Sequence, residues 1–259
     1  MRIVVLVKPV PDTTGAERLG DDLRLDRTAG PAIVNPNDEY AVEQALRLVE
    51  AHGGDITLLT MAPPGGAETM RKALAMGADR GVLVSDDALG GACALGTAKV
   101  LAAALATIPF DLVLAGAASA DGAGGVVASA IATFRRLPYL SHAAGVEVAD
   151  GRVRVQRLEA DGHAVLDAPL PALVTVTQMV GEPRYATLRG IMGARAKEIR
   201  SVDLAELGLD AADVGGTAAR VRVLGATLPP PRPPARVVTG PAEDGAAAIL
   251  DLLVARSFA

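Results

Sequence analysis

The sequence predicts an α/β fold: a doubly wound, mostly parallel sheet with helices on both faces, then an antiparallel hairpin and an extended C-terminal arm. The first observation is the unbroken β-branched and aliphatic run over 3–7, which is typical of a strand buried on both faces. The second is the alternation of strand-like and helix-like segments up to residue 134. The third is the proline-rich tract over 227–238, which favours an extended, semi-rigid segment.

Four strand–loop–helix units make up the first half of the chain. The strand-like runs are IVVLV, ITLLT, GVLVS and DLVLAG. The helix-like segments are NPNDEYAVEQALRLVEAHGG, AETMRKALAMGADR, 92–105 and 126–134. Residues that cap helices open the first helix, and Gly53 and Gly54 end it. Four successive units predict parallel strands joined by right-handed crossovers.

The pattern changes after these units. The stretch GRVRVQRLEADGHAVLDA alternates charged and apolar residues around Asp161 and Gly162, which predicts an antiparallel hairpin with one solvated face. PALVTVTQ predicts one more strand. Beyond residue 182 the periodicity fades into loop and short helix, and a last helix is expected over 246–255. We therefore expect an α/β domain over 1–225 and a C-terminal arm over 226–259.

Composition and charge exclude several functions. A net charge of −5 with interspersed signs gives no basic stripe, so we expect no nucleic-acid binding. The lone Cys93 excludes an internal disulfide and a cysteine metal cluster, so no metal site is predicted. No apolar run has the length of a membrane span, and the first residues do not follow the order of a signal peptide. These features predict a soluble, cytoplasmic protein without membrane insertion.

Three loops follow predicted strands and should converge on one edge of the sheet, where open α/β sheets bind ligands. They cover 8–13, 61–66 and 116–125, and a fourth segment, 35–38, begins a helix. Backbone N–H groups at a helix start bind anions such as phosphate, and glycine lets a backbone approach one closely. A flexible turn is the alternative, because the glycine-rich loop matches neither a P-loop nor a dinucleotide fingerprint.

Residues with catalytic chemistry are isolated. The three histidines stand apart: His52, His142 and His163. Cys93 lies among Gly and Ala on a predicted helix, which is typical of a small buried residue. Capping or hydrogen bonding explains the loop carboxylates as well as acid–base chemistry does: Asp12, Asp121 and Glu182. With no catalytic residue identified, the sequence indicates a carrier or binding subunit and not an enzyme.

Five ordered blocks carry a resemblance to a known family. They are VLVKPVPDT, VNPNDEYAVEQALRL, ETMRKALAMGADRGVLV, FDLVLAGAASADG and, in the second half, LPALVTVTQMVGEPRYATLRGIMGARAKEI with its internal EPRYATL. From residue 1 to about residue 209 the chain is similar to electron transfer flavoprotein β subunits. The stretch ASADGAGGVV resembles actinobacterial members in particular.

The resemblance implies an adenine-nucleotide-binding type of fold and a heterodimer with an α subunit that shares a redox-active FAD. It implies AMP bound in this subunit, or a second FAD if the chain is an electron-bifurcating member. Electrons would pass from dehydrogenases such as acyl-CoA dehydrogenases of fatty acid β-oxidation to a membrane quinone reductase. The arm over 226–259 would dock on the α subunit. A stand-alone nucleotide-binding regulator remains the alternative from another functional class.

Matching positions imply two sets of site residues. The nucleotide would contact Leu6, Asn35, Pro36, Asn37, Asp38, Met61, Gly116, Asp121, Gly122, Gly124, Gly125, Val126 and Val127, and Thr13 would approach the flavin. Residues 182–200, here called the recognition segment, would bind dehydrogenases, with Leu188 as the anchor. Its other expected contacts are Arg184, Tyr185, Ile191, Met192, Arg195 and Lys197. The alternative for Leu188 is packing on its own domain.

The chain departs from the family pattern at three places. An Asn-Gln-Thr-Gly run is replaced over 125–128, so backbone N–H groups would have to bind the phosphate without a threonine hydroxyl. A hairpin glutamate, thought to steady the flavin domain, aligns with Leu158, although Glu159 is adjacent. A lysine cluster is diluted to GARAKE, so partner choice and its salt dependence would differ, because charges at the rim of an interface mainly set the association rate.

Overall fold

The structure is a computed structural model that describes residues 1–12, 18–27, 30–227, 230–231 and 234–258. The strands are β1 (Arg2–Leu6), β2 (Pro9–Pro11), β3 (Ala32–Val34), β4 (Asp55–Met61), β5 (Arg80–Val84), β6 (Leu112–Gly116), β7 (Tyr139–Ala149), β8 (Arg152–Glu159), β9 (Gly162–Pro169), β10 (Ala172–Val176) and β11 (Ile199–Val202). The α-helices are α1 (Pro36–His52), α2 (Gly66–Met76), α3 (Ala94–Ala106), α4 (Val127–Arg135), α5 (Leu188–Ala194) and α6 (Ala242–Ala255). Short 3-10 helices are η1 (Asp87–Leu89), η2 (Gln178–Val180), η3 (Ala211–Asp213) and η4 (Gly216–Ala218).

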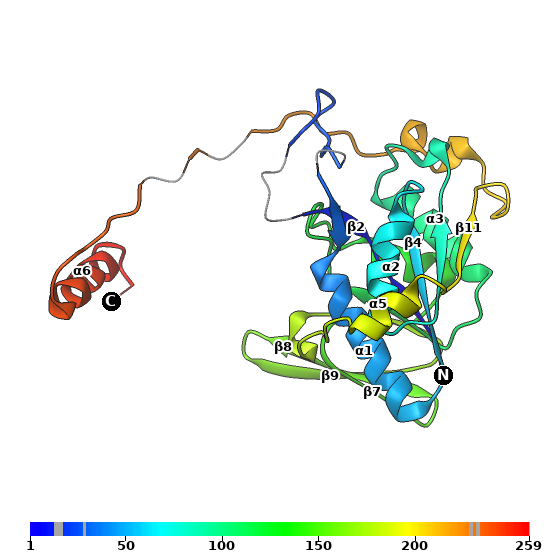
Figure 1. Ribbon diagram of the computed structural model, residues 1–259, viewed down its shortest axis with the longest axis horizontal. Helices are drawn as coiled ribbons and strands as arrows, with labels where there is room; N and C mark the ends of the chain where they lie inside the picture. Colours follow the sequence, from blue (N-terminus) through cyan, green and yellow to red (C-terminus); the bar gives the residue numbers. More distant parts are fainter. Residues whose placement is uncertain (13–17, 28–29, 228–229, 232–233, 259) are drawn as a thin grey trace. The chain divides into compact units, whose positions relative to one another are not determined.

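A nine-stranded sheet organises the first of two compact units, Met1–Leu224 (Figure 1). Its strand order is β11-β5-β4-β1-β6-β10-β7-β8-β9, and every pair from β11 to β7 is parallel. At the other end of this sheet the pairs β7–β8 and β8–β9 are antiparallel. The predicted fold class, a mostly parallel doubly wound sheet with an antiparallel hairpin, is confirmed.

Two apolar clusters fill the space between the sheet and its helices. Alternation along β1 sends Ile3 and Val5 into a cluster with α1 and α2, and Val4 and Leu6 into a second cluster with α3 and α4. Burial on both faces explains why the central strands read as continuous apolar runs. The helices therefore cover opposite faces and leave the strand ends accessible.

Four strands of the structure were not predicted: β2, β3, β7 and β11. β7 was not predicted, because Ser141, His142 and Gly145 interrupt its alternation, and its pairing shifts register between Ala143 and Gly145. β11 was not predicted because it is a short edge strand with two exposed residues. The predicted loop after β1 contains β2, which pairs with β3 in a separate ribbon.

Pro9 and Pro11 can occupy β2 because their nitrogens do not face the paired strand β3. Lys8 accepts a backbone bond from Asn35, and Asp12 donates one to Pro31. Since neighbouring residues of a strand face opposite sides, Pro9 and Pro11 occupy the positions that do not need a donor.

The second unit, Gly225–Ala259, contains the helix α6. Five aliphatic residues of this helix are exposed: Ile249, Leu250, Leu252, Leu253 and Val254. Among the residues that the structure describes, no helix combines the length and apolar character needed to cross a membrane.

Candidate nucleotide site and recognition segment

The loops that follow β1 and β6 meet at the carboxyl edge of the sheet. The Nζ of Lys8 lies 3.2 Å from Ser119 Oγ and 2.7 Å from Asp121 Oδ1. The loop after β4 reaches the same edge, since a Cβ placed on Gly66 would lie 3.4 Å from Pro9 Cγ. Parallel strands end on a common side, so the three loops predicted to converge do lie together.

Two asparagines at the start of α1 hold the loop after β6. Asn35 donates from Nδ2 to the carbonyl of Ala118 at 3.1 Å, and its Oδ1 accepts the Ala120 N–H at 3.0 Å. Asn37 donates to the same Ala118 carbonyl at 2.8 Å. At Gly116, a Cβ would lie 2.6 Å from the backbone of Asn37, so only glycine permits this approach.

Asp38 is a buried carboxylate in the first turn of α1. Its Oδ2 accepts the backbone N–H of Lys8 at 2.8 Å, which ties the loop after β1 to the helix. Burial raises the pKa of Asp38 to about 7, and hydrogen bonds from Asn35 and from backbone N–H groups only partly oppose this shift. Near neutral pH the side chain is therefore divided between its acid and its carboxylate form.

Asp121 is held between two cations. Its side chain is almost inaccessible, with Lys8 Nζ at 2.7 Å and Arg27 Nη2 at 2.8 Å. Burial alone would raise the pKa of Asp121, but the hydrogen bond and charge of Lys8, with Arg27, outweigh it and lower the pKa to about 2. Hydrogen bonding, one of the two explanations that the sequence left open for Asp121, is what the structure shows.

Sequence reasoning did not select Lys8 or Arg27 as site residues. The two residues lie 113 and 94 positions from Asp121 in the chain, so no local spacing could pair them. Lys8 and Arg27 both pair with Asp121, so two cations lie beside the glycine-rich loop. Cations beside such a loop favour an anionic ligand.

The remaining positions of the predicted nucleotide set lie around this edge. Leu6 ends β1, Met61 ends β4, and Pro36 is the first residue of α1. The loop continues through Gly122, Gly124 and Gly125 to the start of α4: Gly125 has a positive φ of 62°, and Val126 and Val127 offer no side-chain cap. Thr13 lies outside the described residues.

A cavity of about 570 Å³ adjoins the nucleotide loop. Its lining includes Asn37 and Ala117 from the candidate site and residues of β7, β8 and η2. On β8, Leu158 is exposed toward it, and Arg157 Nε donates to Glu159 Oε1 at 2.7 Å. His142, judged isolated in the sequence, also lines this cavity.

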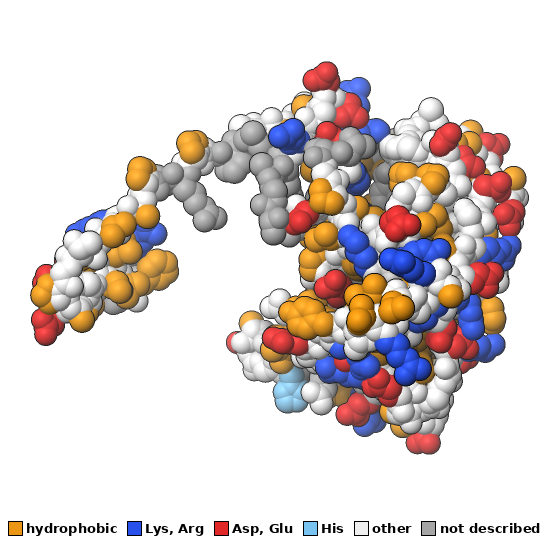
Figure 2. All heavy atoms as spheres, viewed as in Figure 1, with side chains coloured by type: hydrophobic (Ala, Val, Ile, Leu, Met, Phe, Trp, Pro, Cys, Tyr) orange, Lys and Arg blue, Asp and Glu red, His pale blue; other side chains and the backbone are white. Residues whose placement is uncertain are grey.

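The recognition segment exposes an apolar face. Tyr185 is 96% exposed and Leu188 74%, and Ile191 and Met192 are exposed beside them. Figure 2 shows apolar side chains gathered over α5 with basic side chains nearby. Most of Leu188 is therefore not covered by its own domain.

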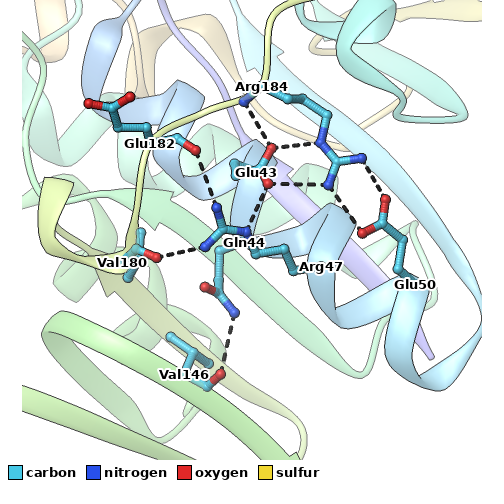
Figure 3. A network of polar contacts seen from close by, with 8 residues as sticks. All are labelled: Glu43, Gln44, Arg47, Glu50, Val146, Val180, Glu182 and Arg184. Atoms are coloured by element: carbon cyan, nitrogen blue, oxygen red, sulfur yellow. Dashed lines mark hydrogen bonds and ion pairs between the residues drawn. The ribbon is translucent and has the colours of Figure 1, made fainter.

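Two residues expected to bind the partner are engaged within the chain. Arg184 bonds to Glu43 and Glu50 of α1 (Figure 3). Lys197 donates from Nζ to the carbonyls of Leu74 and Ala78, at 3.0 and 2.6 Å, at the end of α2. Arg195, by contrast, is exposed.

Comparison with known proteins agrees with this architecture. The family model of the electron transfer flavoprotein domain matches residues 22–207. The chain belongs to the electron transfer flavoprotein family, as a β subunit. It is 40% identical to the electron transfer flavoprotein subunit beta of Mycobacterium leprae, over 99% of this chain and 98% of the relative.

More distant relatives cover almost the same length. The subunit beta of Clostridium acetobutylicum is 32% identical over 98% of each chain. The caffeyl-CoA reductase-Etf complex subunit CarD of Acetobacterium woodii is 34% identical, over 93% of this chain and 92% of that protein. Electron transfer flavoprotein β subunits are electron carriers and not enzymes in the usual sense, and they work with an α subunit, a flavin and other redox enzymes.

Proposed function

We propose that this chain is the β subunit of a cytoplasmic heterodimer that carries electrons from flavin dehydrogenases, such as acyl-CoA dehydrogenases, to a membrane quinone reductase. In this proposal residues 1–225 form the nucleotide-binding domain and 226–259 the arm that docks on the α subunit. The observation that carries the nucleotide part is the Lys8–Asp121–Arg27 cluster beside the glycine-rich loop.

The cluster and its loop fit AMP. Lys8 and Arg27 place two cations beside the loop, and a phosphate could accept charge-assisted hydrogen bonds from them. Gly116 lets the start of α1 approach the loop, and Gly125 provides the positive φ before α4. Val127 has no hydroxyl, so the phosphate would be held by backbone N–H groups and by the two cations.

The redox chemistry would belong to the flavin. When bound to the assembled heterodimer, FAD accepts and releases the electrons, and the protein supplies binding and orientation. This accounts for a chain with no identified catalytic acid, base or nucleophile. The exposed apolar face of α5, with Leu188 as anchor, would tether the dehydrogenase.

A second candidate, the electron-bifurcating type with its own FAD, is favoured by the cavity of about 570 Å³. Its volume lies within the range of small-molecule and cofactor sites. Because Asn37 and Ala117 line it, a nucleotide longer than AMP could extend into it from the loop. A stand-alone regulator is less favoured, since the exposed aliphatic residues of α6 are typical of a surface that another protein covers.

The test is to purify the chain alone and with its α partner, denature both samples and identify every released nucleotide by mass. AMP from the chain, with FAD only in the pair, is expected. FAD from the chain alone would move the assignment to the bifurcating type. No nucleotide from either sample would contradict the site, and failure to form the pair would support the regulator.

A single substitution tests whether the Lys8–Asp121–Arg27 cluster binds the phosphate of AMP. Arg27→Gln should lower the AMP retained by the chain about tenfold, because a charge-assisted contact to phosphate is lost. Arg80→Gln is the matched control: its guanidinium also pairs with an aspartate, Asp55, at 2.7 Å, but at the opposite ends of the strands. Equal retention in the two variants would argue against a phosphate between Lys8 and Arg27.

A further inference from the structure

Glu43 of α1 is a buried carboxylate whose two oxygens are both occupied by guanidinium groups (Figure 3). Its Oε2 accepts the Arg184 backbone N–H at 3.1 Å and the Arg184 Nε at 2.8 Å. Its Oε1 accepts Arg184 Nη2 at 3.2 Å and Arg47 Nε at 2.8 Å. We call Glu43, Arg47, Glu50 and Arg184 the α1 ion-pair network.

Arg47 extends this network to the backbone that leads into the recognition segment. Its Nη1 donates to the Val180 carbonyl at 2.9 Å and its Nη2 to the Glu182 carbonyl at 3.3 Å. Gly181, between them, has a φ of 113°, and a Cβ there would lie 2.6 Å from Arg47 Nη1. The backbone therefore lies directly against the guanidinium, and the positive φ favours glycine at 181.

The far end of α5 is held separately. Arg71 Nη1 donates to the Ala194 carbonyl at 2.9 Å, and α5 lies beside α2 (Figure 1). A Cβ on Gly190 would lie 2.4 Å from the Ala75 carbonyl, so the helices are in backbone contact. Between these two attachments lie the exposed Tyr185 and Leu188. Both ends of the apolar face are thus fixed to the domain.

Arg184 differs from Arg189 and Arg195 of the recognition segment because its charge is paired within the chain. The α1 ion-pair network holds two arginines and two glutamates, so Arg184 adds little net field at the surface. Arg189 and Arg195 are exposed on α5 and at its end. Exposed charges of this kind steer association, whereas paired ones fix geometry.

We propose that Arg184 is a positioning residue: with Glu43 and Arg47 it fixes the start of the recognition segment on α1 and does not contact the redox partner itself. The orientation of Leu188 and its neighbours follows from this attachment. The identity of the partner rests on the proposed function, while the attachment does not.

The first test measures the segment without any redox partner. In the complex with the α subunit, Arg184→Gln should speed amide hydrogen exchange over 182–190 about tenfold or more, because charge-assisted bonds to Glu43 are lost. Arg184→Lys should restore only part of the protection, since an ammonium cannot reproduce the forked contact. Arg189→Gln, which removes the same charge from an exposed position, should leave exchange unchanged. Unchanged exchange in Arg184→Gln would overturn the proposal.

The second test uses a purified acyl-CoA dehydrogenase as the electron donor and follows flavin reduction at several salt concentrations. Arg184→Gln combined with Glu50→Gln, which keeps the network neutral, should raise KM about tenfold with the wild-type salt dependence, and Arg189→Gln should weaken the salt dependence. A weaker salt dependence in this double variant, with normal exchange, would mean direct partner contact and overturn positioning. Faster exchange with an unchanged KM would support the attachment and contradict the proposed role of the segment.

Discussion

Two buried carboxylates of the same helix titrate in opposite directions. Asp38, at the start of α1 beside the candidate nucleotide site, is 6% exposed, and Glu43, facing the recognition segment, is 3% exposed. Burial raises the pKa of Asp38 to about 7. Burial also acts on Glu43, but hydrogen bonds from Arg184 and Arg47 outweigh it and lower its pKa.

The difference lies in the partners. Asp38 is bonded mainly by neutral groups, an asparagine side chain and backbone N–H groups, which do not compensate for lost hydration of the charge. Glu43 is bonded by two guanidinium groups, and their positive charges compensate for the hydration that its carboxylate loses. Deep burial among neutral partners therefore gives a proton-binding site at the start of α1, whereas two guanidinium partners keep Glu43 charged further along it.

The largest effect should come from removing both guanidinium groups. Arg47→Met with Arg184→Met leaves Glu43 charged, buried and unpaired, and this should lower the free energy of unfolding by about 3–5 kcal/mol. Urea unfolding of the purified protein at pH 7 measures the loss. Adding Glu43→Leu should recover most of it, because an apolar replacement of the whole network carries no uncompensated charge. A loss below about 1 kcal/mol would mean that water already solvates Glu43.

Asp38→Asn should change how stability depends on pH. The folded pKa of about 7 lies above the unfolded value of about 3.9, so the folded state binds the extra proton between these values. Stability should then fall as pH rises from about 4 to 7, by up to about 1.4 kcal/mol per unit. Asparagine removes this proton, and the variant should show a flatter profile in urea titrations over that range.

Asp121→Asn is the matched control for this measurement. Its folded pKa of about 2 lies below the unfolded value, so its contribution is present above about pH 4 and is lost as pH falls toward 2. The control should therefore leave the slope between pH 5 and 7 unchanged. If both variants flattened the dependence of stability on pH equally, the neutral partners of Asp38 and the charged partners of Asp121 would not explain their different pKa values.

Much of the fold could be predicted because it depends on local periodicity. The buried parallel strands read as apolar runs, and Gly53 ends α1 where the sequence indicated. The sequence did not predict β7, because its polar and glycine residues lie at the bulge and in the cavity wall and not in the core. A strand whose residues line a site lacks the regular apolar pattern by which strands are recognised in a sequence.

The sites were predictable only in part, for a related reason. The spacing of Glu43 and Arg47 is that of neighbours on one helix face, so this pair was readable in principle. Arg184 lies 141 positions beyond Glu43, and nothing local distinguishes it from an arginine that faces a partner. The positive charge of Arg184 and its position in a loop suggested that it binds a partner. Its long-range contact with Glu43 instead holds the side chain against α1.

The smallest effect should come from Glu50, the exposed member of the α1 ion-pair network. Its side chain is 57% exposed, and hydrogen bonding by Arg184 lowers its pKa. Solvent screens such a pair, so Glu50→Gln should lower the free energy of unfolding by about 0.5 kcal/mol or less. Arg184 remains held by both oxygens of Glu43, so amide exchange over 182–190 should also stay near wild type. A loss above about 2 kcal/mol would place the anchor at Glu50, and burial of the carboxylate would then no longer explain why the recognition segment is fixed to α1.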